Sequence, residues 1–273
     1  MSDEPQLKPV ADHFSGVSNS YAAFRPSYPE ALFDALADMA PSHALAWDSG
    51  AGTGQATLAL TQRFASVLAT DSSASQIGQA TPHPRVTYRV APAHDSELPD
   101  GSVGLITVAQ ALHWFDVDAF HAEAQRVLVP HGIIAEWTYA LAEVPSSSAL
   151  TELIASLDAT VGTWWPPERE HVNNGYSALE FPFTRVEPGN FCMEADWSPE
   201  QLLGYLSTWS AITHMRNETG VDPLVEFAAG LDRWWGRVPL HRFKWPLSLR
   251  VGRHEKGAPP PVQLPPQPPQ QQA

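Results

Sequence analysis

The sequence predicts an α/β protein built on a parallel sheet, and three observations lead to this fold class. Five apolar runs of four to six residues, typical of buried strands, alternate with segments of helical periodicity. A glycine-rich turn, residues 50–54, joins the first of these runs to a helix. The alternation stops after Tyr139, where an irregular region rich in tryptophan begins. We therefore expect a sheet in the first half of the chain and an added layer in the second.

Each expected strand of the first half has an identifiable boundary. The strands are expected at residues 44–47, 66–70, 86–90, 104–109 and 133–137. The connecting helices are expected at residues 57–64, 73–80 and 116–128. The last of these helices should end at Pro130-His131-Gly132, because proline and glycine interrupt helices. Strands joined in this way run parallel, with right-handed crossovers.

The second half predicts a ligand-binding layer inserted before the last strand. We expect helices at residues 149–161, 201–209 and 224–235, and strands at 191–197 and 243–251. Ser198 is the expected N-cap of the second helix, with Pro199 at its first position. The Trp164-Trp165-Pro166-Pro167 segment is loop-like, and either a lid or simple packing accounts for it.

Composition excludes several classes of protein. Thirty acidic and sixteen basic residues give a formal charge of -14, which argues against nucleic-acid and anionic-membrane surfaces. The single cysteine, Cys192, excludes a disulfide within the chain and a Cys-rich metal site. We see neither a secretory signal nor an apolar run of the ~20 residues that span a bilayer, so we expect a cytoplasmic protein. The Pro/Gln-rich residues 258–273 are expected to be a solvated tail, with an SH3-type partner as the alternative.

The glycine loop carries the strongest functional signal. It reads Asp48-Ser49-Gly50-Ala51-Gly52-Thr53-Gly54-Gln55, and such a strand–helix turn offers free backbone N–H groups to a ligand. Its third glycine comes one residue earlier than in the dinucleotide pattern Gly-x-Gly-x-x-Gly. Asp48 would repel a pyrophosphate but suits a ligand that carries an ammonium group. Asp71, at the end of the second strand, is placed to accept hydrogen bonds from both ribose hydroxyls of an adenosine.

With these residues, the chain resembles the class I S-adenosylmethionine-dependent methyltransferases, whose first motif is acid-x-Gly-x-Gly-x-Gly. More narrowly it resembles the trans-aconitate methyltransferase-like group, over roughly residues 12–253. The narrower resemblance rests on an N-terminal signature, on residues 109–116 (Ala-Gln-Ala-Leu-His-Trp-Phe-Asp) and on Thr208-Trp209-Ser210 and Trp245-Pro246-Leu247. The signature consists of Phe14, Tyr21, Arg25, Pro26, Tyr28 and Pro29.

The resemblance implies a Rossmann-like sheet with helices on both faces and a helical, aromatic substrate-binding layer. It divides the chain into residues 1–42 (tail and cofactor-capping helices), 43–140 (cofactor-binding core), 141–242 (substrate-binding and lid region), 243–253 (final core strand) and 254–273 (Pro/Gln tail). The cofactor is S-adenosylmethionine, the acceptor a small molecule, and no metal is required. Its expected contacts are Tyr21, Arg25, Asp48, Gly50, Gly52, Gly54, Asp71, Ser72, Ala93, His94 and Gln110.

We expect the methyl acceptor to contact Tyr28, His113, Trp114 and Trp209. Methyl transfer from a sulfonium is an in-line displacement, and a base is required only when the nucleophile arrives protonated. His113, just past the fourth strand, has three open roles: general base, hydrogen-bond donor to the substrate, or support for Trp114. We expect O-methylation of a carboxylate or a hydroxyl. His94 occupies a position where this methyltransferase family often has an acidic residue, and its role is open.

Two alternatives remain from the sequence. One is a catalytically silent cofactor-binding or regulatory module on the same fold, for which the Pro/Gln tail is an interaction element. The other is an NAD-dependent oxidoreductase, against which the glycine spacing argues.

Overall fold

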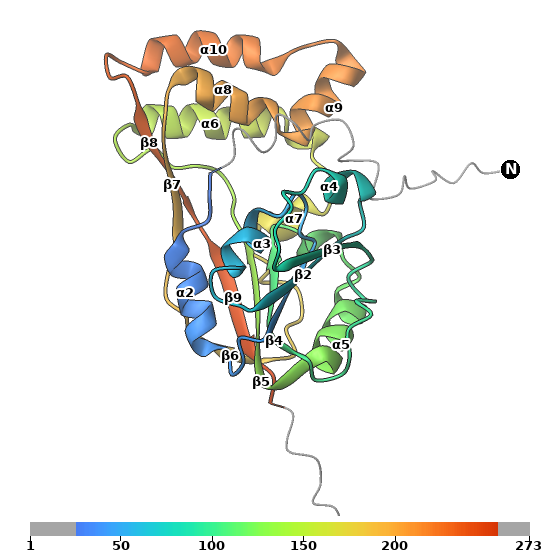
Figure 1. The fold of residues 1–273 in the computed structure, drawn as a ribbon. Coiled ribbons are helices and arrows are strands. Elements are labelled where there is room, and N and C mark those ends of the chain that lie inside the picture. The colour runs from blue at the N-terminus through green and yellow to red at the C-terminus, as the bar shows by residue number, and fades with distance from the viewer. Residues whose placement is uncertain (1–25, 256–273) are drawn as a thin grey trace, which may run out of the picture.

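Seven strands form one mixed sheet within residues 26–255, the part of the chain that the computed structural model describes (Figure 1). The strand order is β3-β2-β1-β4-β5-β9-β6. Strands β7 and β8 form a separate antiparallel pair. The strands are β1 (Leu45–Ser49), β2 (Ser66–Asp71), β3 (Val86–Val90), β4 (Val103–Ala109), β5 (Leu128–Thr138), β6 (Thr184–Val186), β7 (Cys192–Trp197), β8 (His241–Pro246) and β9 (Ser248–Arg253).

The helices of the described residues fall into two sets, those beside the large sheet and those of the added layer (Figure 1). Beside the sheet lie α2 (Glu30–Met39), α3 (Gln55–Leu60), α4 (Ala74–Gly78), the 3-10 helix η2 (Leu112–Trp114) and α5 (Val117–Val127). The later elements are α6 (Ser148–Thr160), the 3-10 helix η3 (Gly162–Trp164), α7 (Arg169–Asn173), α8 (Pro199–Ser207), α9 (Ser210–Thr219) and α10 (Pro223–Trp234).

The parallel part of the sheet places its loops where a ligand binds. Strands β1 to β5 are parallel, and the chain runs outward from β1 to β3 before it returns to β4 on the other side of β1. Loops that leave β1 and β4 therefore diverge. A crevice opens at the carboxyl ends of strands at such a switch point.

Alternating side chains of the strands supply two cores, one on each face of the sheet. Ala46 and Leu105 belong to the cluster shared with α2 and α3, whereas their neighbours Trp47 and Ile106 belong to the cluster shared with α5. Helices therefore cover both faces, as a buried parallel sheet requires. The predicted α/β class with helices on both faces is confirmed.

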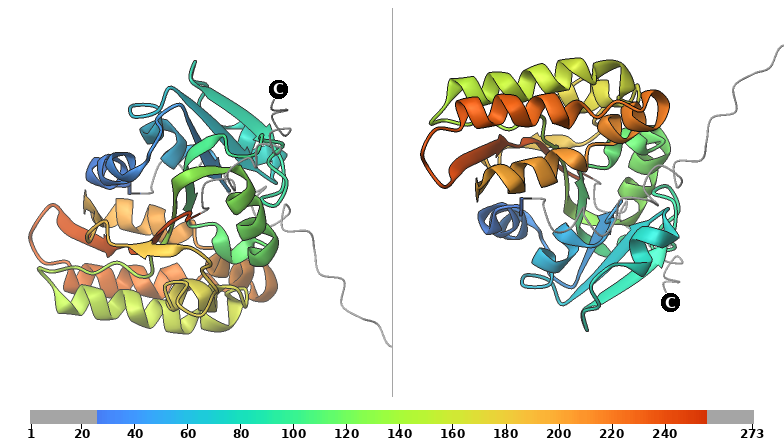
Figure 2. Two further views of the ribbon diagram at one scale, coloured as in Figure 1. Left: turned by 90° about the horizontal axis from the view of Figure 1, so that it is seen from below. Right: turned by 90° about the horizontal axis from the view of Figure 1, so that it is seen from above.

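In the added layer, α8 packs against β7, α10 packs against α6 and α8, and α9 packs against η3. In Figure 2, α6 and α10 lie side by side in the outermost layer. Aromatic rings fill the space between α8 and the two strands: the Trp197 ring centroid lies 4.9 Å from that of Trp245 and 5.1 Å from that of Tyr205. Ser198 caps α8 through a capping box with Gln201, and Pro199 occupies its first turn.

The expected single strand at residues 243–251 is two strands in two sheets. Strand β8 pairs with β7 and ends at Pro246, and β9 begins at Ser248 and pairs with β5. Proline has no N–H to give to a ladder, so the chain leaves one sheet there and enters the other. Residues 243–246 therefore belong to β8 in the added layer, and the final core strand begins at Ser248 rather than at residue 243.

The expected break at Pro130-His131-Gly132 is a bulged extension of a strand. Strand β5 already begins at Leu128, and the register shifts so that Val103 faces Leu128 while Leu105 faces Ile133. The extra residues remain paired, because the N–H of His131 donates to the carbonyl of His254 (2.9 Å). A left-handed backbone at His131, with φ 63°, accommodates the bulge.

Strand β6, helices α7 and α9 and the two 3-10 helices were not expected from the sequence. Strand β6 has only three residues, and α9 contains Thr213, Asn217 and Thr219, which favour helices weakly. Residues 1–25 of the expected tail and cofactor-capping segment, and the expected solvated tail at 258–273, lie outside the described residues.

Candidate active site

A pocket of about 330 Å³ opens at the carboxyl ends of the first four strands. Its walls come from the loops that follow β1, β2, β3 and β4, and from Tyr28 ahead of α2. This volume lies in the range of pockets that hold small ligands. The lining residues are Tyr28, Gly50, Ala51, Gly52, Thr53, Gln55, Ala56, Asp71, Ser72, Ser73, Gln76, Ala91, Pro92, Ala93, His94, Ala109, Gln110, Ala111, Trp114, Phe115 and Asp116.

The glycine loop follows β1 in a left-handed conformation that glycine adopts without strain. Gly50 has φ 68°, and a Cβ there would lie 2.5 Å from the Cβ of Ala111. Gly52 has φ 57°, and the nearest atom to its Cβ would be Gln76 Oε1 at 4.0 Å. Gly50 is thus needed for close packing against the loop after β4, whereas Gly52 borders open space in the pocket. Gly54 packs against Tyr88 and is not among the lining residues.

Asp71 ties the second strand to the glycine loop. Its Oδ2 accepts a hydrogen bond from the N–H of Gly52 (2.9 Å), and its Oδ1 accepts one from the N–H of Ser73 (2.8 Å). Each carboxylate oxygen keeps a further lone pair for a ligand. Burial raises the pKa of Asp71 from its usual range, and these two N–H donors oppose the rise. Asp71 therefore both shapes the loop and faces the pocket.

Asp48 lies behind the glycine loop, not in the pocket wall. Its side chain is fully buried, and it accepts hydrogen bonds from the hydroxyls of Thr57 (2.5 Å) and Thr107 (2.8 Å). It thereby joins β1 to α3 and β4. Burial raises its pKa to about 6, against the two hydroxyl donors. The structure does not bring Asp48 to the position expected for contact with a ligand's ammonium group.

Gln110 lines the pocket in a strained conformation. Its φ of 58° is unusual for a residue other than glycine. The side-chain oxygen of Gln110 accepts from the hydroxyl of Thr138 (2.6 Å) and from the N–H of Tyr139 (3.0 Å). These bonds fix the amide against the end of β5. Strain held by several contacts is common at functional sites.

His113 is turned away from the pocket. Its neighbour Trp114 lines the pocket, but His113 Nδ1 lies 3.1 Å from the hydroxyl of Tyr176. Burial, followed by the nearby charges of Arg169 and His171, lowers the pKa of His113 to about 3. The imidazole is therefore neutral at physiological pH. This geometry favours the third of its expected roles, support of the segment that carries Trp114.

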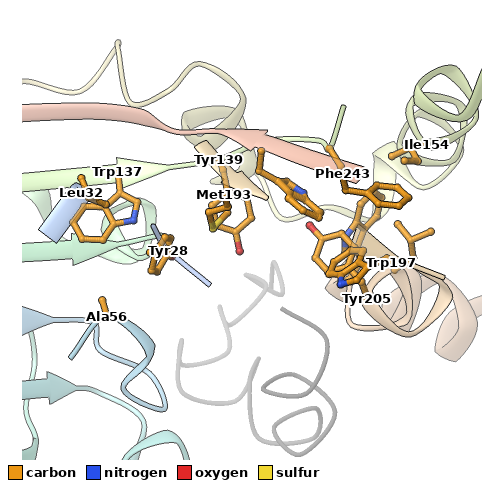
Figure 3. Packing of buried hydrophobic residues seen from close by; sticks show 14 of the residues in the cluster. Tyr28, Leu32, Ala56, Trp137, Tyr139, Ile154, Met193, Trp197, Tyr205 and Phe243 are labelled. Atoms are coloured by element: carbon orange, nitrogen blue, oxygen red, sulfur yellow. The ribbon is translucent and has the colours of Figure 1, made fainter. Parts of the chain in front are cut away.

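Tyr28 and Trp209 lie at different depths of one aromatic cluster. Tyr28 lines the pocket and packs edge-on against Trp137, with ring centroids 5.4 Å apart. Trp209 does not line the pocket and packs against Trp165 in the added layer, at 5.5 Å. Figure 3 shows the cluster extending from Tyr28 and Trp137 to Tyr205 and Phe243.

The remaining expected site residues divide into two groups. Ser72, Ala93 and His94 line the pocket, from the loops after β2 and β3. Tyr21 and Arg25 lie outside the described residues.

The structure adds residues that the sequence did not suggest. Asp116 lines the pocket and caps α5, since its side chain accepts from the N–H of Ala119. Gln76 lines it from α4. Tyr176 contacts His113 from far along the chain. A helix N-cap signal marks Asp116 in the sequence, but no pattern marks Tyr176.

No cluster of His, Cys, Asp or Glu suited to a metal ion occurs within residues 26–255. In the same part of the chain, no helix has the length and apolarity needed to cross a membrane.

Comparisons with known proteins agree on one type of domain. Residues 47–135 match the methyltransferase-domain family. A Dictyostelium discoideum protein named as a methyltransferase is 34% identical over 206 residues, which cover 73% of this chain and 77% of that protein. A solved structure from Anaeromyxobacter dehalogenans, whose name describes a type II methyltransferase, is 45% identical with a TM-score of 0.79 and covers 85% of this chain and 98% of its own.

A third relative has a more specific name. The malonyl-[acyl-carrier protein] O-methyltransferase of Alcanivorax borkumensis is 28% identical over 232 residues, which cover 81% of this chain and 74% of that protein.

Proposed function

Because the chain belongs to the class I S-adenosylmethionine-dependent methyltransferases, we propose that it methylates a carboxylate oxygen of a small-molecule acceptor. S-adenosylmethionine, the family's cofactor, supplies a methyl group that its positive sulfur activates. What the protein itself must do is hold both reactants in line, with the reacting atoms about 3–3.5 Å apart, and exclude water. Each of these tasks falls to residues of the pocket.

The described residues fit this cofactor. Gly52 borders open space at the start of α3, so its backbone is accessible to a ligand. Asp71 has unused lone pairs, which suit the two ribose hydroxyls. We assign Ser72, Ala93 and His94 to the adenosine side and Gln110 to the opposite wall. Further proposed cofactor contacts, on sequence grounds alone, are Tyr21 and Arg25.

The proposal of a carboxylate acceptor is carried by the lack of a general base among the described pocket residues. The side chains there that titrate are Tyr28, Asp71, His94 and Asp116. Asp71 is committed to the loop and the ribose, and Asp116 caps α5. We assign His94 to the adenosine side of the pocket and the Tyr28 phenol to the acceptor wall. For His113, a general base was one of three open roles, but its side chain does not line the pocket and binds a proton too weakly to serve near neutral pH. An alcohol or a phenol needs a base, whereas a carboxylate is already ionised.

Two similarities support this acceptor class. The Alcanivorax borkumensis relative is named for O-methylation of a malonyl group, which carries a carboxylate. The trans-aconitate methyltransferase-like group, to which we propose this chain belongs, is likewise named for a carboxylic acid. Tyr28 and Trp114 are the proposed acceptor walls at the pocket. Trp209 stands further back, in the aromatic cluster.

The experiment is transfer of a labelled methyl group from S-adenosylmethionine to matched panels of carboxylic acids, phenols and amines. We expect label in the carboxylate panel that alkali releases as methanol, because esters hydrolyse there and methyl ethers and methylamines do not. The rate should be flat between pH 6 and 9, since no imidazole titrates in the reaction. Alkali-stable label, or a rate that falls below a pH near the usual imidazole pKa, would contradict the proposal.

A further inference from the structure

One continuous segment forms the wall of the pocket on the β4 side. Of residues 109–116, Leu112 and His113 alone do not line the pocket. These two side chains point instead into the protein, where Leu112 is fully buried and His113 meets Tyr176. The position of this wall therefore depends on what holds Leu112 and His113.

A single phenol oxygen lies beside two points of the wall. The Tyr176 hydroxyl contacts the His113 ring at 3.1 Å and also interacts with the side chain of Thr138. Thr138 in turn donates to the side-chain oxygen of Gln110 (2.6 Å), at the start of the wall. Through Thr138 and His113, the Tyr176 hydroxyl reaches the residues on either side of Ala111 and Leu112.

The hydroxyl of Thr138 donates its one proton to the side-chain oxygen of Gln110. The His113 ring is neutral because burial depresses its pKa, so it carries one N–H and one nitrogen that accepts. The tautomer of this ring decides which group donates in the contact between Nδ1 and the Tyr176 hydroxyl.

Tyr176 itself is held firmly from behind. It is fully buried with a left-handed backbone at φ 61°. The carbonyl of Tyr176 accepts a hydrogen bond from Arg250 Nη1 (2.9 Å). The Nε of the same arginine donates to the buried carboxylate of Glu136 (2.6 Å). His121 of α5 lies 2.7 Å from the same carboxylate. Strands β5 and β9 and helix α5 thus fix a strained residue, which is the condition under which strain persists.

We infer that Tyr176 is a positioning residue, which sets the β4-side wall of the cofactor pocket through His113 and through Thr138 and Gln110. The inference rests on the proposed placement of the cofactor in this pocket. It explains why a histidine that faces away from the ligand stands beside Trp114. It also connects the segment after α7, which comes late in the chain, to the loop that follows β4.

The first test is S-adenosylhomocysteine binding by isothermal titration calorimetry, with Tyr176→Phe compared with the wild type well below both melting temperatures. Loss of the hydroxyl removes the contact with His113 and the interaction with Thr138, so we expect the Kd to rise about five- to tenfold. The matched control is Thr61→Val, which removes another buried hydroxyl, one that donates to the carbonyl of Leu58 (2.6 Å). Thr61→Val should lower the melting temperature and leave the Kd unchanged.

The second test uses His113. His113→Asn keeps an N–H donor near the position of Nδ1 and should bind S-adenosylhomocysteine nearly as the wild type does. His113→Leu should resemble Tyr176→Phe, and the double variant should be little worse than either single one, because both remove the same bond.

The outcomes separate this inference from the proposed function. A wild-type protein that binds no S-adenosylhomocysteine would overturn the cofactor assignment. A wild-type protein that binds it, together with a folded Tyr176→Phe of equal affinity, would overturn the positioning role alone. Fully additive losses in the double variant would also overturn that role, since independent effects add.

Discussion

Asp71 is the residue on which the cofactor assignment can be tested most directly. We predict that Asp71→Ala weakens S-adenosylmethionine binding by about 30- to 700-fold, because two hydrogen bonds to a charged acceptor are worth roughly 2–4 kcal/mol. The measurement is isothermal titration calorimetry. Asp38→Ala, an exposed carboxylate on α2, is the control and should bind as the wild type does.

Asp71 also holds Gly52 and Ser73, so a second variant separates ligand contact from loop structure. Asp71→Asn keeps one acceptor oxygen and should fall between the wild type and Asp71→Ala. Unchanged affinity in a folded Asp71→Ala would show that the carboxylate does not contact the ribose.

Asp48 predicts a pH dependence of folding stability. Its pKa is about 6 in the folded protein and 3.8 in the unfolded chain. Between these values the folded state binds more protons, so the contribution of Asp48 to stability is fully present below pH 3.8 and is lost as the pH rises through about 6. The loss amounts to about 3 kcal/mol as an order of magnitude. The free-energy cost of burying the ionised Asp48 carboxylate therefore applies at neutral pH.

Asp48→Asn should remove this pH dependence, since the hydroxyls of Thr57 and Thr107 can rotate to suit an amide. Urea unfolding of both proteins from pH 4 to pH 8 measures it. The variant should gain stability relative to the wild type as the pH rises from 4 to 7. A constant difference across this range would mean that Asp48 does not titrate as stated.

The sequence identified Asp48 and Asp71 with equal ease, but it could not tell where each side chain points. Both residues lie at the ends of apolar runs that border the glycine loop. Side chains of a strand alternate between its two faces, so a shift of one residue decides whether an acid meets a ligand or a helix. Tyr176 lay beyond prediction for another reason. Its partner His113 is 63 residues away, and no periodicity connects the two.

At the scale of the element, the glycine loop predicts different effects for two similar substitutions. Gly50→Ala should lower both stability and cofactor affinity, since its Cβ would lie 2.5 Å from the Cβ of Ala111 and 3.0 Å from the Phe115 ring. Gly52→Ala meets no such clash. It should cost only the roughly 1–2 kcal/mol of a left-handed residue, yet lower the affinity at least tenfold by adding a methyl group beside the ligand.

The control for both is Gly101→Ala, whose backbone has φ 58° and whose Cβ would have no atom within 4 Å. It carries the same strain away from the pocket. Thermal unfolding and calorimetric titration of the three variants give stability and affinity separately. If Gly52→Ala and Gly101→Ala bound the cofactor equally well, the loop would not contact it.

Local patterns predicted the elements that are long and bounded, and failed where two sheets meet. Strand β3 and helix α6 lie within a residue of their expected ranges, because apolar spacing and caps mark their ends. The apolar residues on both sides of Pro246 read as one strand. Only the partners of β8 and β9 show that they belong to different sheets, and strand pairing is a long-range property.

At the scale of the whole molecule, the switch point explains why a short motif predicts the place of the site. The loops after β1, β2, β3 and β4 come from sequence positions between 50 and 116, and the parallel order brings them to one edge. Any sequence that folds with this strand order brings these loops together at the carboxyl ends of the strands. No comparable topological rule applies to the added layer. Its aromatic residues could therefore be identified from the sequence, but their arrangement in space could not be predicted.

Ligand binding to the folded state alone should raise the stability of the whole molecule. At a concentration of 100 times its Kd, S-adenosylmethionine adds about 2.7 kcal/mol. For a chain of this size that corresponds to a melting temperature higher by about 5–10 °C. Differential scanning fluorimetry measures this shift, and S-adenosylhomocysteine should give one of similar size.

Two controls make the shift specific to the pocket. NAD at the same concentration should leave the melting temperature unchanged, because Gly54 comes one residue too early for the dinucleotide pattern. Asp71→Ala should lose most of the S-adenosylmethionine shift at that concentration. A shift with NAD and none with S-adenosylmethionine would restore the oxidoreductase interpretation. If S-adenosylmethionine raised the melting temperature of Asp71→Ala as much as that of the wild type, the cofactor would not bind at the carboxyl ends of the strands.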